Sequence, residues 1–255
     1  MTNIFELIKK PQEAYPGEIE DQERLDADLR RRPRGEREII RAVSRRYEME
    51  ASSEAYQSDP SNLINFLRKS AVMRDTPSIV DLGCGSGNLV SALASVYEDK
   101  RILGIDLSSG FVRTFNSETL SANAVMRMGL IDSPGVVERC GDLTDGGVIS
   151  VLTADRVTDP EQLVQNMAAF EGPKVLATLL PIIAEDDNPS RTENKLIYTP
   201  PEKRITPGNS AEEDKILLIE KLTDAWGSEV FYDEVPYTVT SSGDTQNYIL
   251  SVFYT

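Results

Sequence analysis

A glycine-rich stretch, Ser78-Ile-Val-Asp-Leu-Gly-Cys-Gly-Ser-Gly-Asn88, constrains the fold of this chain more than any other segment. A short apolar run ends at Asp81, three alternate glycines follow, and apolar residues then recur at helical spacing over 89–94. This order predicts a strand, a tight turn and a helix. Glycines in the turn can adopt positive φ and let a ligand approach the backbone, and the N-terminus of the following helix offers unpaired N–H groups.

A second acidic residue ends the next apolar run, Arg101-Ile-Leu-Gly-Ile-Asp106. In nucleoside-binding α/β sheets, a carboxylate at the tip of the second strand accepts hydrogen bonds from ribose hydroxyls. The dinucleotide fingerprint G-x-G-x-x-G requires a glycine at position 88, where this chain has asparagine. The spacing therefore indicates a nucleoside-containing ligand and argues against a dinucleotide.

The stretch resembles the first motif of the class I S-adenosylmethionine-dependent methyltransferases, whose usual form is Asp81-x-Gly83-x-Gly85-x-Gly87 in the numbering of this chain. The resemblance covers residues 76–180 by motif and 210–254 by the order of elements. It implies S-adenosylmethionine as cofactor and S-adenosylhomocysteine as product. The cofactor-binding residues that it implies are Asp81, Gly83, Cys84, Gly85, Gly87, Asp106, Leu107, Asp142, Leu143 and Thr153.

The resemblance also implies a role for each side chain. Asp81 would reach the methionine ammonium, and Asp106 would accept both ribose hydroxyls in charge-assisted bonds of about 1.5–3 kcal/mol. Asp142 would accept the adenine amino group, while Leu143 would supply its backbone N–H and pack on the ring. Thr153 would lie beside the methionine moiety.

The segment Leu152-Thr-Ala-Asp-Arg-Val157 follows the predicted fourth strand, where the resembled family places its catalytic or substrate edge. Asp155 is a candidate base and Arg156 a candidate partner for an acidic group of the substrate; the alternative is a local ion pair at a strand end. Because no cation lies near Cys84 in sequence, we expect this thiol to fill space in the loop and not to act as a nucleophile.

Alternating strand and helix patterns predict an α/β fold with helices on both faces of a mostly parallel sheet. The resemblance implies seven strands in a Rossmann-like sheet with the last strand antiparallel, inserted between strands five and six. The predicted strands are 78–82, 101–106, 136–140, 148–152, 174–180, 229–233 and 247–254. The predicted helices of this domain are 87–97, a helix from the turn at 108–110 to about 128, and helices beginning after Asp159 and Ser210.

Two units are expected: an N-terminal helical arm or cap over 1–70, and a cofactor-binding domain over 71–255 with a substrate-side insertion at 184–210. Between Arg24 and Arg46 there are nine arginines. They indicate either a basic arm for an acidic ligand or helix faces whose arginines pair with nearby acids. We expect the N-terminal helices to be where any homodimer forms.

Composition excludes several kinds of site. The chain has 255 residues, no histidine, two cysteines and a net charge of −15. A Ser-His-Asp triad and a histidine metal site are therefore excluded, no metal ligand set is expected, and nucleic acid is an unfavourable partner. Without a signal-peptide core or a membrane-length apolar run, a cytoplasmic setting is expected.

The function that these features favour is methyl transfer to a small-molecule acceptor, through oxygen, nitrogen or carbon, in a biosynthetic pathway. Two alternatives stay open. The scaffold could be repurposed as a cyclase or dehydratase, or it could be a non-catalytic protein that binds the cofactor and regulates a partner.

Overall fold

A computed structural model describes residue 15 and residues 17–51, 56–118, 121–154, 156–180, 210–241 and 244–255. Its centre is an eight-stranded sheet in the order β1-β7-β8-β6-β5-β2-β3-β4. The strands are β1 (Tyr56–Asp59), β2 (Ser78–Leu82), β3 (Arg101–Asp106), β4 (Ala124–Met128), β5 (Gly147–Val151), β6 (Lys174–Thr178), β7 (Phe231–Ser241) and β8 (Asp244–Tyr254). Five of them, β2 to β6, run parallel, and β8 pairs antiparallel with both β6 and β7.

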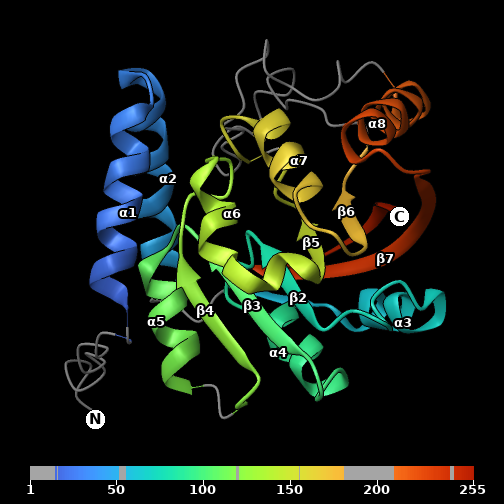
Figure 1. Ribbon diagram of the computed structural model, residues 1–255, viewed down its shortest axis with the longest axis horizontal. Helices are drawn as coiled ribbons and strands as arrows, with labels where there is room; N and C mark the ends of the chain where they lie inside the picture. Colours follow the sequence, from blue (N-terminus) through green and yellow to red (C-terminus); the bar gives the residue numbers. More distant parts are fainter. Residues whose placement is uncertain are drawn as a thin grey trace.

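Helices cover both faces of the sheet, as Figure 1 shows. They are α1 (Glu18–Arg31), α2 (Arg34–Ala51), α3 (Ser61–Ser70), α4 (Asn88–Val96), α5 (Ser109–Glu118), α6 (Gly135–Cys140), α7 (Pro160–Ala168) and α8 (Ala211–Trp226), with a 3-10 turn at Gly141–Asp145. One buried cluster joins α3, α4 and α5 to the sheet, and a second joins α6, α7 and α8 to its other face. In the described part of the chain, no helix is long and apolar enough to cross a membrane.

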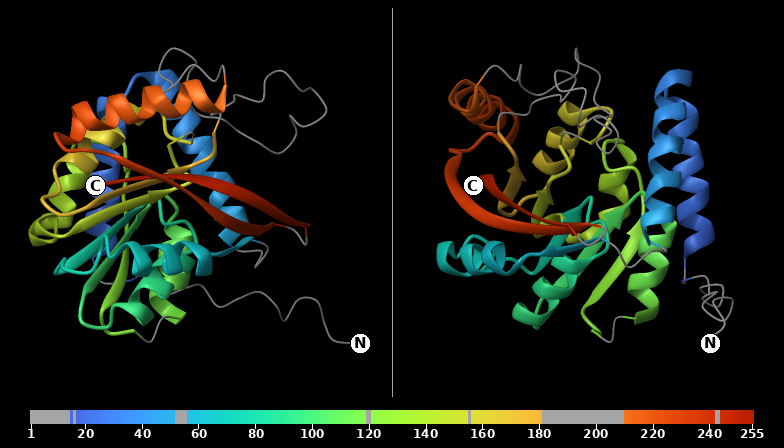
Figure 2. Two further views of the ribbon diagram at one scale, coloured as in Figure 1. Left: turned by 90° about the vertical axis from the view of Figure 1, so that its right-hand side faces the viewer. Right: turned by 180° about the vertical axis from the view of Figure 1, so that it is seen from behind.

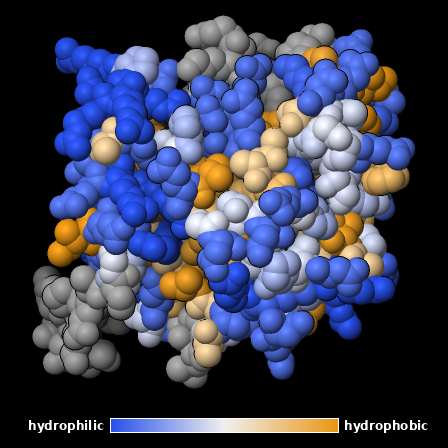
Figure 3. All heavy atoms as spheres, in the orientation of Figure 1, coloured by the Kyte–Doolittle hydropathy of each residue, from blue (hydrophilic) through white to orange (hydrophobic). Residues whose placement is uncertain are grey.

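The first two helices stand beside the edge strand β4 and helix α5 (Figure 1). The Tyr15 hydroxyl accepts a hydrogen bond from the backbone N–H of Met128 and donates one to Asp21 at 2.7 Å. Asp21 also pairs with Arg127, and Asp28 pairs with Arg139. These polar contacts cover an edge that would otherwise expose unpaired backbone groups. The outer surface over these helices is mostly hydrophilic (Figure 3).

Within α1 and α2 and at their junction, three arginines of the 24–46 stretch pair with acids four residues away. The pairs are Arg24–Glu20, Arg32–Glu36 and Arg34–Glu38. These contacts agree with the interpretation that the stretch forms helix faces with internal ion pairs. The division of the chain at residue 70 stays a prediction; α3, on the N-terminal side of it, packs against β7 and α4.

The first half of the predicted core is confirmed: strands at 78–82 and 101–106 and the intervening helix lie where the pattern puts them. Both predicted helix starts are also confirmed. The side chains of Asp159 and Ser210 accept hydrogen bonds from the backbone N–H groups of Gln162 and Glu213. The strand inserted between strand five and its neighbour is β8, between β6 and β7.

The predicted strand over 136–140 is wrong, because these residues form helix α6 after Pro134. The helix predicted after the turn at 108–110 is confirmed at its start but does not reach Met128: α5 ends at Glu118, and 124–128 is the edge strand β4. An edge strand has a half-exposed alternating pattern, and Val125 is indeed exposed while Met126 and Met128 are buried.

One further difference raises the strand count from seven to eight, and another changes the last two strands. Tyr56–Asp59 forms β1, which pairs with residues 238–241, and the last two predicted strands are longer and meet in one hairpin. Figure 2 shows this long twisted ribbon of β7 and β8 crossing the molecule. Within β8, residues 250–253 are buried, whereas Ile249 is 55% exposed. The predicted insertion at 184–210 lies, except for Ser210, outside the described residues.

Candidate cofactor and substrate site

The glycine loop lies at the carboxyl ends of the parallel strands, between β2 and α4. Gly83, Gly85 and Gly87 all have positive φ, a conformation that other residues adopt only with strain. A Cβ on Gly83 would lie 2.5 Å from Thr153, and one on Gly87 would lie 2.4 Å from Phe115. A Cβ on Gly85 would meet nothing within 4 Å. Two of the glycines are therefore needed for close packing, while Gly85 faces open space that a ligand can occupy.

Asp81 ends the apolar part of β2 and is buried with 1% of its surface exposed. Neither of its carboxylate oxygens has a hydrogen-bond partner in the described part of the chain. Burial, and then repulsion from Asp106, raises the pKa of Asp81 to about 8. A buried carboxyl group without a partner is costly, so this one fits a site that receives a cation from the ligand.

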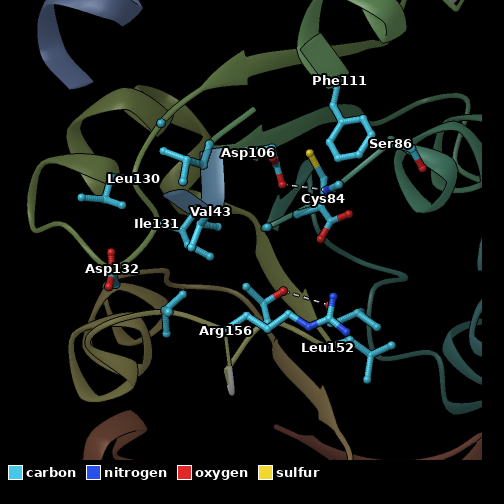
Figure 4. A pocket seen from close by; sticks show the side chains of 18 of the residues that line it. Val43, Cys84, Ser86, Asp106, Phe111, Leu130, Ile131, Asp132, Leu152 and Arg156 are labelled. Carbon is cyan, nitrogen blue, oxygen red and sulfur yellow. Dashed lines mark hydrogen bonds between the residues drawn. The ribbon is translucent and has the colours of Figure 1, made fainter. Parts of the chain in front are cut away.

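Asp106 ends β3 on the other side of the loop. Its Oδ2 accepts the backbone N–H of Gly85 at 2.9 Å, and its Oδ1 accepts the backbone N–H of Ser108 at 2.9 Å. The carboxylate therefore fixes the glycine loop relative to β3. Figure 4 shows Asp106 and Cys84 beside the loop.

These groups line one open pocket, whose empty space of about 1070 Å³ includes its open mouth. Its walls come from the glycine loop, from the ends of β3, β4 and β5, and from α2 and β7. Residues that line it include Ile40, Val43, Ser58, Asp81, Gly83, Cys84, Gly85, Asp106, Leu107, Phe111, Leu130, Ile131, Asp132, Leu152, Thr153, Arg156, Thr158 and Tyr237. Apolar side chains face a few convergent polar groups, an arrangement typical of cofactor sites.

Most of the residues that the sequence singled out meet in this pocket. Leu107, Thr153 and Arg156 line it together with Cys84, whose thiol pKa is raised by burial and then by the two nearby carboxylates. The thiol therefore stays protonated, as expected of a residue that fills space in the loop. Asp155 lies outside the described residues. No group of acidic and cysteine residues in the described part of the chain could hold a metal ion.

Asp142 and Leu143 do not belong to the pocket. Asp142 is exposed and pairs with Arg101, the first residue of β3, at 2.6 Å. The Leu143 carbonyl accepts a hydrogen bond from Ser78, the first residue of β2. Both residues thus lie at the amino ends of the parallel strands, whereas the glycine loop lies at their carboxyl ends. Their prediction followed from the false strand at 136–140.

The true end of the third parallel strand is Met128, and the residues after it line the pocket: Gly129, Leu130, Ile131 and Asp132. Sequence reasoning missed them because β4 was assigned to a helix. Figure 4 shows Leu130 and Ile131 across the pocket from the glycine loop. Reasoning from the sequence also missed Ile40 and Val43, which contribute a wall of the pocket from α2. Their helical spacing indicates that this face of α2 is buried, but it does not indicate which part of the protein covers it.

Residues 80–170 match the family model described as "Methyltransferase domain". The model spans the glycine loop, Asp106 and the loops after β4 and β5. This match identifies a methyltransferase domain over residues 80–170, in agreement with the resemblance of the glycine stretch to class I S-adenosylmethionine-dependent methyltransferases.

Relatives of this methyltransferase domain include two proteins named trans-aconitate 2-methyltransferase. The one from Rhodopseudomonas palustris is 26% identical over an alignment of 116 residues, and the match covers 37% of this chain and 45% of the relative. The one from Methylobacterium radiotolerans is 26% identical over an alignment of 127 residues, and the match covers 41% of this chain and 48% of the relative. The chain thus spans a little under half the length of these curated relatives.

Solved structures share the fold at low sequence identity. A methyltransferase structure from Anabaena variabilis, described as dependent on S-adenosylmethionine, has a TM-score of 0.59 and 14% identity, with 85% of this chain and 93% of that chain covered. The N-terminal domain of EvdMO1, solved with S-adenosylhomocysteine and D-fucose, has a TM-score of 0.51 and 18% identity, with 83% and 95% covered. These similarities concern the fold of the methyltransferase domain.

Proposed function

We propose that this chain transfers a methyl group from S-adenosylmethionine to a small-molecule acceptor. The observation that carries the proposal is Asp81, a buried carboxyl group that lines the pocket without a hydrogen-bond partner. An α-ammonium group placed there would neutralise it. The ligand seen in the EvdMO1 structure, S-adenosylhomocysteine, carries such a group. The residues present therefore fit the cofactor.

In this proposal, different residues of the pocket contact different parts of the cofactor. Asp81 would hold the ammonium, the backbone at Gly85 would face the methionine and ribose part, and Asp106 would accept the ribose hydroxyls. Leu107 and Leu130 would enclose the adenine ring by apolar contact. The segment after β4, and not Asp142, would form the adenine side of the pocket.

When bound, the cofactor supplies an electrophilic methyl group, so the protein chiefly aligns the acceptor with it and excludes water. The loop after β5 is the acceptor wall in this proposal. Thr153 packs against the glycine loop, and Arg156 lines the pocket (Figure 4). Asp155 stays the candidate base for an acceptor that must lose a proton, and a cytoplasmic reaction stays a prediction.

The first test is calorimetric titration of the purified chain with S-adenosylmethionine, S-adenosylhomocysteine and NAD. We expect micromolar binding of the first two and no binding of NAD. Binding of NAD alone would contradict the assignment of the glycine loop. Cofactor binding without methyl transfer to any acceptor in a broad screen would favour the two alternatives, a repurposed cyclase or dehydratase and a regulatory partner.

The acceptor class that the loop favours is a carboxylate-bearing small molecule, held by Arg156. Two relatives carry the name of an enzyme acting on trans-aconitate, an anion. We expect Arg156→Met to raise the KM for trans-aconitate, used as a probe acceptor, by at least about tenfold, because a charge-assisted pair contributes about 1.5–3 kcal/mol. Affinity for S-adenosylhomocysteine should stay within twofold of the wild type, as measured by calorimetry.

Arg156→Lys is the matched variant, since it keeps the charge and loses the planar guanidinium. A rise in KM for Arg156→Met that Arg156→Lys partly reverses would support an anionic acceptor. If Arg156→Met instead weakens S-adenosylhomocysteine binding and leaves the acceptor KM unchanged, the arginine serves the cofactor's own carboxylate and the assignment is wrong.

A further inference from the structure

Arg32 lies at the corner between α1 and α2. Its side chain contacts one residue nearby in the sequence and two that are about 100 or more positions away. Its side chain is 12% exposed. Nη2 lies 3.2 Å from Oδ1 of Asp132 and donates a hydrogen bond to the backbone carbonyl of the same residue. Nη1 lies 3.3 Å from Glu36 and 3.9 Å from Asp159. One guanidinium thus meets three carboxylates.

The three carboxylates come from three segments that each contribute residues to the pocket, and Asp132 itself lines it. Glu36 is in α2, the helix that contributes Ile40 and Val43. Asp132 ends the lining segment after β4. Asp159 is the N-cap of α7 and closes the lining loop after β5. Arg32 therefore connects the N-terminal helices to the segment after β4 and to the loop after β5.

Asp132 also connects the segment after β4 directly to the loop after β5, independently of Arg32. Its Oδ2 accepts hydrogen bonds from the Thr158 hydroxyl at 2.8 Å and from the backbone N–H of Asp159 at 2.9 Å. Its Oδ1 has no hydrogen bond within the described residues and faces Arg32. Because Asp132 is 1% exposed, a carboxylate there depends on the cation beside it.

We propose that Arg32 is a positioning residue that sets the distance between the helical cap, the segment after β4 and the loop after β5, and so shapes the pocket for the nucleoside end of the cofactor. The proposal rests on the proposed function only where S-adenosylhomocysteine is the probe. The planar fork of arginine suits this role, because it presents donors to several acceptors at once, whereas lysine presents a single point charge.

The experiment compares Arg32→Met, Arg32→Lys and the matched control Arg34→Met in the full chain. Arg34 lies two residues away, is 85% exposed and pairs with Glu38. We expect Arg32→Met to weaken S-adenosylhomocysteine binding at least about tenfold by calorimetry. Arg32→Lys keeps a cation beside the buried Asp132, so it should remain folded and recover part of the affinity. Arg34→Met should bind within twofold of the wild type.

Hydrogen exchange of the unliganded proteins gives a second readout that needs no ligand. In Arg32→Met, residues 36–45, 129–133 and 156–162 should lose protection together, while β2 and β3 stay protected. Loss of protection confined to residues 17–51 would overturn the proposal, as would wild-type affinity in Arg32→Met. If the wild type binds no S-adenosylhomocysteine, the proposed function fails, and the exchange experiment still decides the role of Arg32.

Discussion

Replacing Asp106 by alanine is expected to abolish detectable binding of S-adenosylhomocysteine. The carboxylate would accept two ribose hydroxyls, and each charge-assisted bond contributes about 1.5–3 kcal/mol, so the affinity should fall by at least about 100-fold. The substitution also releases the backbone N–H groups of Gly85 and Ser108, which Asp106 holds at 2.9 Å. Calorimetry at several hundred micromolar ligand measures the loss.

The fold should survive this change, because Asp106 is at the end of β3, whose other core residues remain in place. Far-ultraviolet circular dichroism and a cooperative thermal transition would check that. Asp142→Ala is the control. It removes an exposed acid at the amino ends of the parallel strands, away from the pocket, so the affinity for S-adenosylhomocysteine should be unchanged. Unchanged binding by Asp106→Ala would mean that the ribose lies elsewhere in the pocket.

Replacing Asp81 by asparagine is expected to stabilise the unliganded protein at high pH and to weaken its ligand binding. In the folded protein the pKa of Asp81 is raised from 3.8 to about 8. The folded state therefore holds this proton more tightly than the unfolded chain. The stabilising contribution of the protonated group is fully present below about pH 4 and is lost as the pH rises through about 8.

Asparagine carries no charge at any of these pH values, so the loss does not occur in the variant. At pH 9 the unliganded Asp81→Asn protein should melt at least about 5 °C above the wild type, since each kcal/mol shifts the melting temperature of a chain this size by about 2–4 °C. At pH 5 the two proteins should melt within a few degrees of each other. A melting difference that does not grow with pH would contradict the raised pKa.

Ligand binding should show the complementary trend. The ammonium of S-adenosylhomocysteine favours ionised Asp81, so wild-type affinity should rise up to about tenfold per pH unit from pH 6 toward 8, with release of a proton. Above about pH 8 Asp81 is already ionised, so the affinity should stop rising near that value. Asp81→Asn should bind more weakly and without the rise, while Asp142→Asn should follow the wild type.

The strand, loop and helix around the glycines were predictable because every determinant is local. The apolar run of β2, the glycines that must adopt positive φ and the helical spacing of α4 lie within residues 78–96. Asp106 was predictable for the same reason, since it ends the next apolar run. These two segments supply the cofactor side of the candidate site.

The adenine side was not predictable from local pattern. Val136-Val137 is a β-branched pair that favours a strand, yet after Pro134 it forms a helix that buries Val136 and Cys140 against the sheet. The edge strand β4 alternates too weakly to be distinguished from helical spacing. One wrong strand placed the expected adenine contact at Asp142, which lies at the opposite end of the parallel strands from the pocket.

The sequence by itself determined the nucleoside-binding unit and its two acids, because adjacent residues encode a strand end, a turn and a helix start without help from the rest of the chain. Only the tertiary structure decided what encloses that unit. Arg32 and Asp132 are 100 positions apart and meet because α1 and α2 cover the edge strand β4. β1 joins the sheet by pairing with residues 238–241. Such contacts depend on how separate elements pack together, and no short-range pattern in the chain specifies that packing.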